Sequence, residues 1–319
     1  MGASLLVQLT WTIYTGYRDI SSPYFGLLVM ILMERFNQYG RLMRLNKPIG
    51  ILLLLWPTLW SLWFAIDGPP SWVILCIFLL GAILMRSAGC VMNDFADRNF
   101  DLYVERTKDR PLATGVVSTK EALLLATTLS LCAFLLILNL NRLTIILSGC
   151  ALFLAISYPF TKRFLAIPQA YLGIAFSFGI PMAFSAQTGE LPLIVWLLMM
   201  ANLLWVIAYD TEYAMVDKID DLKIGIKTSA ITFGRFDIVG IMLCHLIFLT
   251  IMVGVGVAQK MGFLYYIGLG ISLGLIIYQY SLIYDRNPAH CFKAFLHNNW
   301  VGGTIFFGIV LDYFTRTIL

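Results

Sequence analysis

Charged residues are scarce in this sequence. Only 13% of its 319 residues are Asp, Glu, Lys or Arg, whereas 60% are hydrophobic; an ordinary soluble domain carries about 25% charge. This composition argues against a soluble protein and points to a lipid environment, and no nucleic-acid partner is expected. The six cysteines include no CxxC pair, so no disulfide framework is expected. The three histidines also lack metal-ligand neighbours, and His245 is interpreted as an isolated, satisfied helix contact, with His290 and His297 on a loop.

Long apolar runs recur from Ile49 to the C-terminus. Each is close to the length that a helix needs to cross about 30 Å of hydrocarbon, and each is apolar on every face, so helices are the economical way to satisfy the backbone. The sequence predicts an all-α, multi-pass membrane protein, a bundle of nine transmembrane helices with a polar site on its cytoplasmic side. The predicted spans are residues 49–66, 72–92, 121–138, 143–158, 169–186, 191–209, 238–257, 263–284 and 300–314.

Basic residues are distributed unevenly between the loops. The segment before the first span and the loops after spans 2, 4, 6 and 8 carry nearly all the Lys and Arg, and such loops lie on the cytoplasmic side. We therefore expect these segments in the cytoplasm, with the protein in a bacterial inner membrane. No linker divides residues 33–319, which are expected to form one membrane domain. Met33 begins a stretch typical of a natural start, so residues 1–32 are expected to be a dispensable extension.

An acidic stretch follows the second predicted span. Residues 93–101, NDFADRNFD, contain three aspartates and two asparagines, and no glycine or proline separates them from the span, so the helix is expected to continue through them. At roughly 100° per residue, Asn93, Asp94, Asp97 and Asp101 share one face; we call them the first acidic stripe. Because like charges on neighbouring turns repel, the pattern favours a bound cation over the alternative, a solvated helix end.

A second acidic stretch follows the sixth predicted span in the same way. In residues 209–228, YDTEYAMVDKIDDLKIGIKT, the helical period places Asp210, Asp217 and Asp221 on one face; we call them the second acidic stripe. The two spans are four apart, so their helices run parallel and carry both stripes to the cytoplasmic side. A pair of such stripes weakens the alternative of solvated helix ends.

Acidic stripes beside basic residues suggest a metal-bound phosphate ligand. Mg²⁺ is usually held by a few carboxylates together with substrate phosphates, and basic side chains suit the remaining phosphate oxygens. The nearby bases are Arg106, Lys108, Arg110, Lys162, Arg163 and Lys223. The implied ligand is a diphosphate, and because the site caps a membrane bundle, the rest of the ligand should be apolar and reach it through the lipid bilayer.

Arg86 is a charged residue inside an apolar span. A charge in that position is energetically unfavourable, so it marks a functional site that faces the bundle interior. The alternative is a structural ion pair with one of the aspartates.

Both acidic stretches resemble signatures of the UbiA superfamily of intramembrane aromatic prenyltransferases. NDFADRNFD resembles the first signature, and DTEYAMVDKIDDLKIGIKT resembles the second in the 4-hydroxybenzoate polyprenyltransferase branch. RLNKPIG (44–50), DRPLATG (109–115) and SYPFTKR (157–163) also resemble that branch. The resemblance covers roughly residues 41–316, and residues 1–32 lie outside it.

The resemblance implies roles for individual residues. Its metal ligands would be Asn93, Asp97 and Asp101 for one Mg²⁺ and Asp217 and Asp221 for a second, with the diphosphate between them; the four aspartates would be catalytic. Its substrate-binding residues would be Asn93, the Tyr158 and Lys162 of a YxxxK element, and Arg86, which matches an arginine of the family's central cavity. The family fold is a nine-helix bundle with a lateral opening for the lipid chain.

The implied activity is transfer of a polyprenyl group from polyprenyl diphosphate to the ring carbon ortho to the hydroxyl of 4-hydroxybenzoate, in ubiquinone biosynthesis. Arg86 would receive the substrate carboxylate or help to hold the phosphates, and the base that removes the ring proton is unassigned. The alternatives are a superfamily enzyme with another aromatic acceptor and a membrane transporter. A transporter fits less well, because transport sites lie near the midplane on broken helices, whereas both stripes follow unbroken spans.

Overall fold

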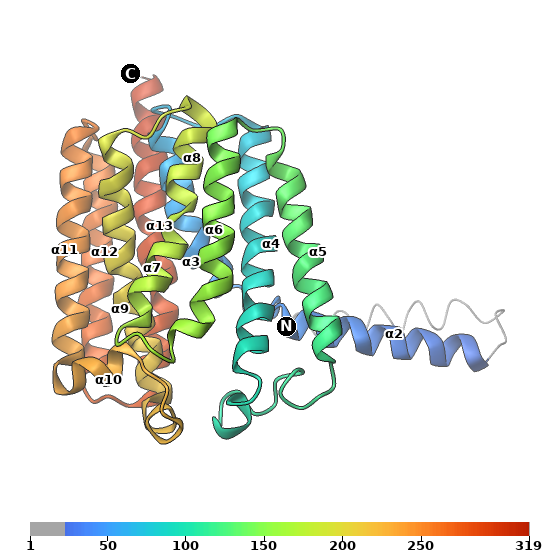
Figure 1. The fold of residues 1–319 in the computed structure, drawn as a ribbon. Coiled ribbons are helices and arrows are strands. Elements are labelled where there is room, and N and C mark those ends of the chain that lie inside the picture. Colours follow the sequence, from blue (N-terminus) through green and yellow to red (C-terminus); the bar gives the residue numbers. More distant parts are fainter. Residues whose placement is uncertain (1–22, 319) are drawn as a thin grey trace.

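Helices that run side by side form one bundle (Figure 1). The structure is a computed structural model that describes residues 23–318, and within that range it contains helices and no strands, as expected. Seven stretches of the described chain are long and apolar enough to cross a membrane. The chain is therefore an integral membrane protein, and the count of nine spans stays a prediction.

The helices follow the predicted order. The long ones are α3 (Ile49–Phe64), α4 (Trp72–Asp97), α5 (Thr119–Ile137), α6 (Arg142–Thr161), α9 (Leu193–Ile224), α11 (Asp237–Ala258), α12 (Phe263–Ile283) and α13 (Pro288–Ile318). The shorter ones are α7 (Pro168–Ser177), α8 (Gly179–Thr188), α10 (Ser229–Phe233) and the 3₁₀ turns η1 (Asp101–Tyr103) and η2 (Gly234–Phe236). An additional helix, α2 (Pro23–Leu42), extends sideways from the bundle (Figure 1).

Polar residues begin and end several helices. Ser71 caps α4, Asn141 caps α6, and Ser118 forms a capping box with Glu121 at the start of α5; each side chain satisfies a backbone N–H group that has no partner within its helix. Gly225, with φ of 73°, ends α9 in the left-handed conformation, which glycine adopts at low cost.

The fifth predicted span is broken into α7 and α8. Pro181, in the first turn of α8, has no N–H group to continue the helical hydrogen bonds of α7. A Cβ atom on Gly179 would lie 2.2 Å from Thr58 Oγ1, so glycine at the break lets α3 approach closely. The two halves have ten residues each, too few for either to cross a bilayer alone.

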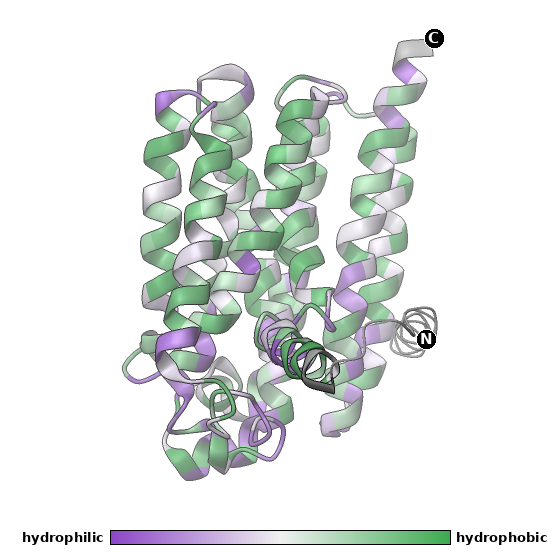
Figure 2. Ribbon diagram, turned by 90° about the vertical axis from the view of Figure 1, so that its right-hand side faces the viewer, coloured by the Kyte–Doolittle hydropathy of each residue, from purple (hydrophilic) through white to green (hydrophobic). Residues whose placement is uncertain are grey.

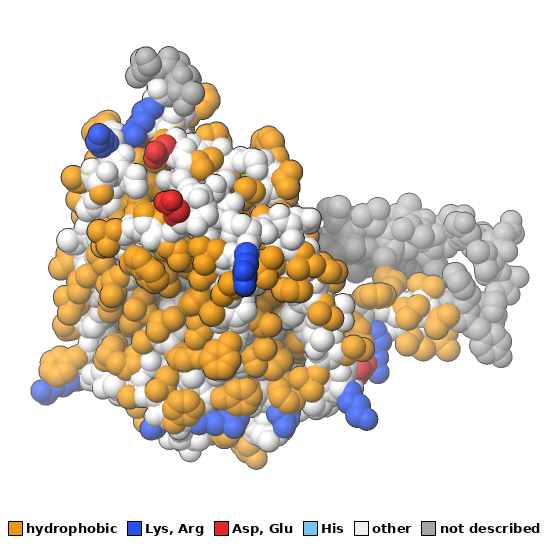
Figure 3. All heavy atoms as spheres, turned by 45° about the horizontal axis from the view of Figure 1, so that its top comes forward, with side chains coloured by type: hydrophobic (Ala, Val, Ile, Leu, Met, Phe, Trp, Pro, Cys, Tyr) orange, Lys and Arg blue, Asp and Glu red, His pale blue; other side chains and the backbone are white. Residues whose placement is uncertain are grey.

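The outer surface of the bundle is apolar. Large hydrophobic side chains are exposed, for example Leu124 at 69% and Phe153 at 68%, and Figure 3 shows a belt of hydrophobic side chains on the face that it displays. Such a large exposed surface needs a nonpolar surrounding. Hydrophilic residues gather in the loops at the end where α4 and α9 finish (Figure 2). We call this the polar end of the bundle.

Several boundaries differ from the sequence prediction. The helix that carries the first acidic stripe ends at Asp97, and Asp101 lies in η1, so the expected continuous helix through residue 101 is wrong. α13 begins at Pro288 and includes both His290 and His297, which were expected on a loop. Of the proposed extension, residues 1–22 lie outside the described residues, and the rest belongs to α2, a helix that hydropathy did not predict.

Candidate active site

Lys162 joins the end of α6 to the first acidic stripe. Its Nζ atom donates to Asp97 Oδ2 at 2.9 Å and to Asn93 Oδ1 at 3.2 Å, and Asn93 Nδ2 donates to the same Asp97 oxygen at 3.2 Å. The ammonium lies 5.7 Å from the centre of the Tyr158 ring. Burial lowers the pKa of Lys162, but the neighbouring Asp97 carboxylate raises it, and the net result is a pKa above its ordinary value. The ammonium group therefore stays charged. The structure thus brings together four of the predicted residues.

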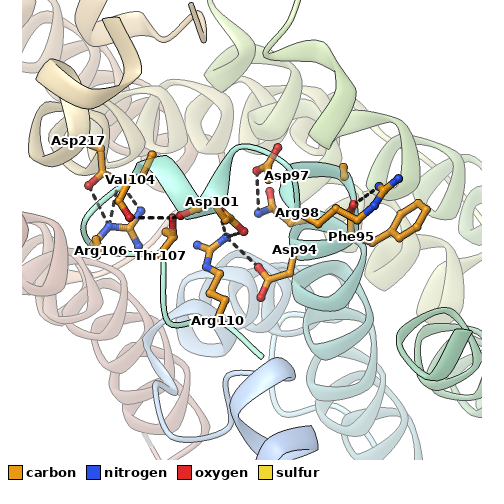
Figure 4. A network of polar contacts seen from close by, with 12 residues as sticks. Asp94, Phe95, Asp97, Arg98, Asp101, Val104, Arg106, Thr107, Arg110 and Asp217 are labelled. Carbon is orange, nitrogen blue, oxygen red and sulfur yellow. Dashed lines mark hydrogen bonds and ion pairs between the residues drawn. The ribbon is translucent and has the colours of Figure 1, made fainter. Parts of the chain in front are cut away.

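Arg110 ties Asp101 back to α4 (Figure 4). Its Nη1 atom donates to the two carboxylate oxygens of Asp101 at 2.8 and 3.0 Å and lies 3.0 Å from Asp94 Oδ1. Burial raises the pKa of the Asp101 carboxyl above its ordinary value, although Arg110 opposes that shift. Asp94 also accepts from Arg44 Nη2 at 2.7 Å, so two arginines hold this aspartate, which anchors the loop to α4.

Arg106 connects the loop after α4 to the second acidic stripe on α9 (Figure 4). Its Nε atom lies 2.9 and 3.1 Å from the two carboxylate oxygens of Asp217, and its Nη2 atom donates to the same carboxylate. The guanidinium group covers the Tyr213 ring at 4.6 Å. Because Arg106 lies five residues after Asp101, this ion pair holds the loop of the first stripe against α9, and residues of both stripes line one site.

Residues of both stripes line one end of a cavity of about 480 Å³; Asp94 of the first stripe is not among them and pairs with Arg44 and Arg110 instead. Its charged lining residues include Asp97, Asp101, Asp217, Asp221, Arg106, Arg110 and Lys162. The remainder of the wall is mainly apolar and comes from α3 to α9 and from α13; Phe78, Phe134, Ile137, Leu152 and Met182 belong to it. A cavity that is charged at one end and apolar at the other fits a ligand with the same division, such as a lipid diphosphate.

Three of the six predicted phosphate-binding bases do not line the cavity. Lys108 pairs with Glu105 at 2.6 Å, and Lys223 pairs with Asp220 at 3.1 Å. Arg163 donates to a backbone carbonyl of α4 at 3.0 Å. We expected these three side chains at the site because they are close to the stripes in sequence. In the structure they point to other partners instead.

Arg86 projects into the cavity from the middle of α4. Its Nη1 atom lies 3.1 Å from Cys90 Sγ, its Nε atom has no hydrogen-bond partner, and it forms no ion pair with a carboxylate among the described residues. Among the described residues, Arg86 therefore does not form the structural ion pair with an aspartate that was the alternative interpretation. A Cβ atom on Gly50 would lie 2.5 Å from the guanidinium, so Gly50 on α3 provides the space that Arg86 occupies.

Asp210 is a cavity residue that the sequence analysis did not select as a site residue. It lies on α9 about two turns from Asp217, nearer the bundle middle, and it forms no ion pair among the residues that the structure describes. The signal was present, because the helical period had already placed Asp210 on the face of the second stripe.

The donor atoms of the stripes fit Mg²⁺. Carboxylate and amide oxygens are hard ligands, and Mg²⁺ retains waters and uses only one or two carboxylates beside substrate phosphates. Within the described chain, no group of three His, Cys, Asp or Glu side chains is arranged to hold a metal ion. The aspartates that would act as ligands are divided between α4, η1 and α9, with space for a ligand between them.

Sequence comparison identifies relatives along most of the chain. The model of the UbiA prenyltransferase family matches residues 54–301. A 4-hydroxybenzoate octaprenyltransferase of Nitrosospira multiformis is 73% identical over 287 residues, which are 90% of this chain and 99% of that protein. The protein of the same name from Nitrosomonas eutropha is 68% identical over 283 residues, covering 89% and 99% of the two chains.

Solved structures share the fold. A UbiA homologue from Aeropyrum pernix, in its apo form, superposes with a TM-score of 0.73 at 24% identity, covering 82% of this chain and 97% of that one. A UbiA homologue from Archaeoglobus fulgidus bound to GPP and Mg²⁺ superposes with a TM-score of 0.63 at 18% identity, covering 86% and 99%. At these identities the likeness shows the fold alone.

Proposed function

Since the chain belongs to the UbiA prenyltransferase family, we propose that it is a 4-hydroxybenzoate polyprenyltransferase. It transfers a polyprenyl group from a polyprenyl diphosphate to the ring carbon ortho to the hydroxyl of 4-hydroxybenzoate, a step in ubiquinone biosynthesis. Relatives at 73% and 68% identity, matched over 99% of their length, are named 4-hydroxybenzoate octaprenyltransferase. The observation that carries the proposal is the cavity, whose charged end is lined by aspartates of both acidic stripes and whose other walls are mainly apolar.

The charged end of the cavity is the proposed site of the diphosphate. Asn93, Asp97 and Asp101 would hold one Mg²⁺, and Asp217 and Asp221 a second. Bound Mg²⁺ supplies positive charge that stabilises the departing diphosphate. The donor chemistry of these side chains and the Mg²⁺ in a homologue structure support this assignment.

Three bases that line the cavity already neutralise prospective metal ligands. Lys162 pairs with Asp97, Arg110 with Asp101, and Arg106 with Asp217. With Mg²⁺ on the carboxylates, Lys162, Arg110 and Arg106 would be free to donate to the phosphate oxygens instead. We therefore assign Arg106, Arg110 and Lys162 to the diphosphate; charge-assisted hydrogen bonds to phosphate are strong, and arginine binds it bidentately.

The aromatic acceptor is proposed to lie between Arg86 and Asp210. The unpartnered Nε atom of Arg86 is a donor suited to the substrate carboxylate, and Phe176 offers an apolar face 5.8 Å from the same guanidinium. The carbon–oxygen bond of the allylic diphosphate breaks, its electron pair leaves with the diphosphate, and the ring carbon ortho to the hydroxyl bonds to the prenyl carbon. Asp210, which has no cation partner within the described chain, accepts the ring proton.

The orientation in the membrane is part of the proposal. Nine spans result if α3 and the pair α7 and α8 each cross the bilayer beside the seven long stretches. The excess of basic residues in the loops at the polar end supports a cytoplasmic position for the site, in a bacterial inner membrane. The polyprenyl diphosphate would then enter from the lipid, and 4-hydroxybenzoate from the cytoplasm.

Product formation tests the function. Membranes that contain the protein are incubated with radiolabelled 4-hydroxybenzoate, a polyprenyl diphosphate and Mg²⁺, and the label is partitioned between aqueous and lipid phases. We expect label in the lipid phase, and none there without the diphosphate. Label that stays aqueous with every chain length tried would contradict the assignment; transfer to a different aromatic acid alone would identify another acceptor within the same family.

A further inference from the structure

Four neighbouring helices each contribute one buried polar side chain to a group in the interior of the bundle. α9, α11, α12 and α13 pack around one another as a group at one side of the bundle (Figure 1). Glu212, Gln279 and Asn298 are 0% exposed, and His245 is 1% exposed. None of the four lines the cavity of the candidate site, so the proposed reaction does not account for them.

These four side chains lie at one level, between two apolar clusters. The next turn of each helix away from the polar end belongs to the larger core cluster; its residues are Tyr209, Phe248, Ile276 and Val301. The next turn in the other direction belongs to a second cluster; its residues are Met215, Ile241, Ile283 and Ala294. We call Glu212, His245, Gln279 and Asn298 the polar layer.

Asn298 is the member of the polar layer whose amide is bonded on both sides. Its Nδ2 atom donates to Glu212 Oε2 at 2.8 Å, and its Oδ1 atom accepts from Trp205 Nε1 at 2.9 Å. The other three have unpartnered atoms within the described chain, namely Glu212 Oε1, both ring nitrogens of His245 and both amide atoms of Gln279. The sequence interpretation of His245 as a satisfied helix contact is therefore wrong.

Direct bonds within the layer do not satisfy these atoms. His245 Nε2 lies 3.9 Å from Glu212 Oε1, which is beyond hydrogen-bond distance. A buried polar group without a partner is strongly unfavourable, more so in the low dielectric of a membrane protein interior. Side chains of His, Glu and Gln together offer donors and acceptors in the number that an internal water requires.

We propose that the polar layer is an internal water site, in which one or more water molecules bridge Glu212, His245 and Gln279. Water is the proposed ligand because only two side chains of the layer, Glu212 and His245, are of metal-binding types, whereas all three bridged side chains offer hydrogen-bonding atoms. Such a site joins α11 and α12 to α9 through hydrogen bonds, in addition to the bond that Asn298 makes from α13.

The water site has a consequence for the orientation of α9. At roughly 100° per residue, Glu212 lies about 200° from Asp210, on the opposite face of the helix. Hydrogen bonds to Glu212 therefore fix the rotation of α9 that turns Asp210, Asp217 and Asp221 to the cavity. Buried polar groups serve this kind of register control in other helical assemblies.

An experimental structure of the intact protein in lipid nanodiscs, at a resolution that shows ordered water, tests the site directly. We expect solvent density within hydrogen-bond distance of Glu212 Oε1, His245 and Gln279. A direct Glu212–His245 hydrogen bond with no solvent density beside Gln279 would overturn the proposal.

The sign of one stability change gives an independent test. Gln279→Met, of similar volume, removes two bridging groups from a hydrated layer, so the melting temperature of the purified protein should fall by several degrees. In a dry layer the same change removes two unsatisfied groups and should raise it. Ile276→Met, one buried turn away on α12, is the control and should shift the melting temperature less. An unchanged or raised melting temperature for Gln279→Met would overturn the water site.

Discussion

The position of the Arg86 guanidinium depends on a residue without a side chain. A Cβ atom at residue 50 would lie 2.5 Å from both Nε and Nη2 of Arg86 and 2.8 Å from its Cζ. The three atoms belong to one planar group, so the whole guanidinium has to move if residue 50 gains a methyl group. Gly50 is thus as important for the acceptor site as Arg86 itself.

Gly50→Ala should therefore impair binding of the aromatic acid. We expect the KM for 4-hydroxybenzoate to rise at least about tenfold, equivalent to about 1.4 kcal/mol, with little change in the KM for the polyprenyl diphosphate. Steady-state kinetics in proteoliposomes measures both. Gly254→Ala on α11, where a Cβ atom meets nothing within 4 Å, is the matched control. Equal KM values for the two variants would show that Arg86 does not depend on this space.

Asp210 provides the second prediction at this scale. If its carboxylate accepts the ring proton, Asp210→Asn should lower kcat by about 100-fold, since general-base contributions begin at that size, while the KM for the diphosphate stays near that of the unmodified protein. Proton removal should then become rate-limiting. 4-Hydroxybenzoate deuterated ortho to its hydroxyl should show a primary isotope effect in the variant and a smaller one in the unmodified protein; the absence of any difference would argue for another base.

At the scale of the element, helical periodicity predicted the second acidic stripe more accurately than the first. α9 continues without a break to Ile224, so Asp210, Asp217 and Asp221 keep the predicted phase. The first stripe leaves the helix after Asp97, because the loop places Arg110 against both Asp94 and Asp101. Arg110 lies in the loop, beyond the end of α4, so the helical period of the sequence could not predict that it pairs with these aspartates.

Long-range contacts also explain the other misses. The break between α7 and α8 depends on the approach of α3 to Gly179, and the space for Arg86 depends on Gly50, 36 positions earlier in the chain. Hydropathy locates apolar runs, but it does not say which helices touch. The apolar runs were therefore predictable, whereas the pairing of each base with its carboxylate was not, and the roles of the site residues stay predictions.

α2 leads to a prediction about the N-terminal residues. Side chains after Met33 join this helix to the loop beyond α4 and to the start of α5: Arg35 donates to Val116 O, Arg41 to Asp109 O, and Tyr39 to Glu121 on α5. A chain that starts at Met33 keeps these three contacts. We expect it to insert into membranes and to transfer prenyl groups at a rate within about twofold of the full chain, which is under about 0.5 kcal/mol in barrier height.

Membrane fractionation and the prenyl-transfer assay, applied to both chains at equal protein amounts, check that expectation. The relevant comparison is turnover per inserted protein. If the shorter chain accumulates normally in the membrane but turns over much more slowly, residues 1–32 contribute to the reaction.

At the scale of the whole molecule, the protein is divided into an apolar outer surface and an enclosed, charged site. The outer belt is apolar, as a bilayer requires (Figure 3), and the charged side chains of the site are enclosed at one end of a cavity that continues as an apolar space between α4, α5 and α6. The substrate has the same division, because a polyprenyl diphosphate is a charged head on a hydrocarbon chain. An allylic cation that forms there is shielded from bulk water.

The central claim is that the two acidic stripes hold metal and diphosphate across the cavity. The most direct measurement is turnover of purified protein with Asp97→Asn, Asp101→Asn, Asp217→Asn or Asp221→Asn, beside Asp220→Asn as control. Asp220 is on α9 as well, but it pairs with Lys223 outside the cavity. Each of the four variants should lose at least about tenfold in turnover per folded, membrane-inserted protein, or about 1.4 kcal/mol, whereas the control stays active.

The same assay also tests whether turnover requires Mg²⁺. Excess EDTA should abolish turnover of the unmodified protein, and added Mg²⁺ should restore it, because the aspartates act on the diphosphate through the metal. Full activity in EDTA, or near-normal turnover of an Asp97→Asn, Asp217→Asn double variant, would contradict the account.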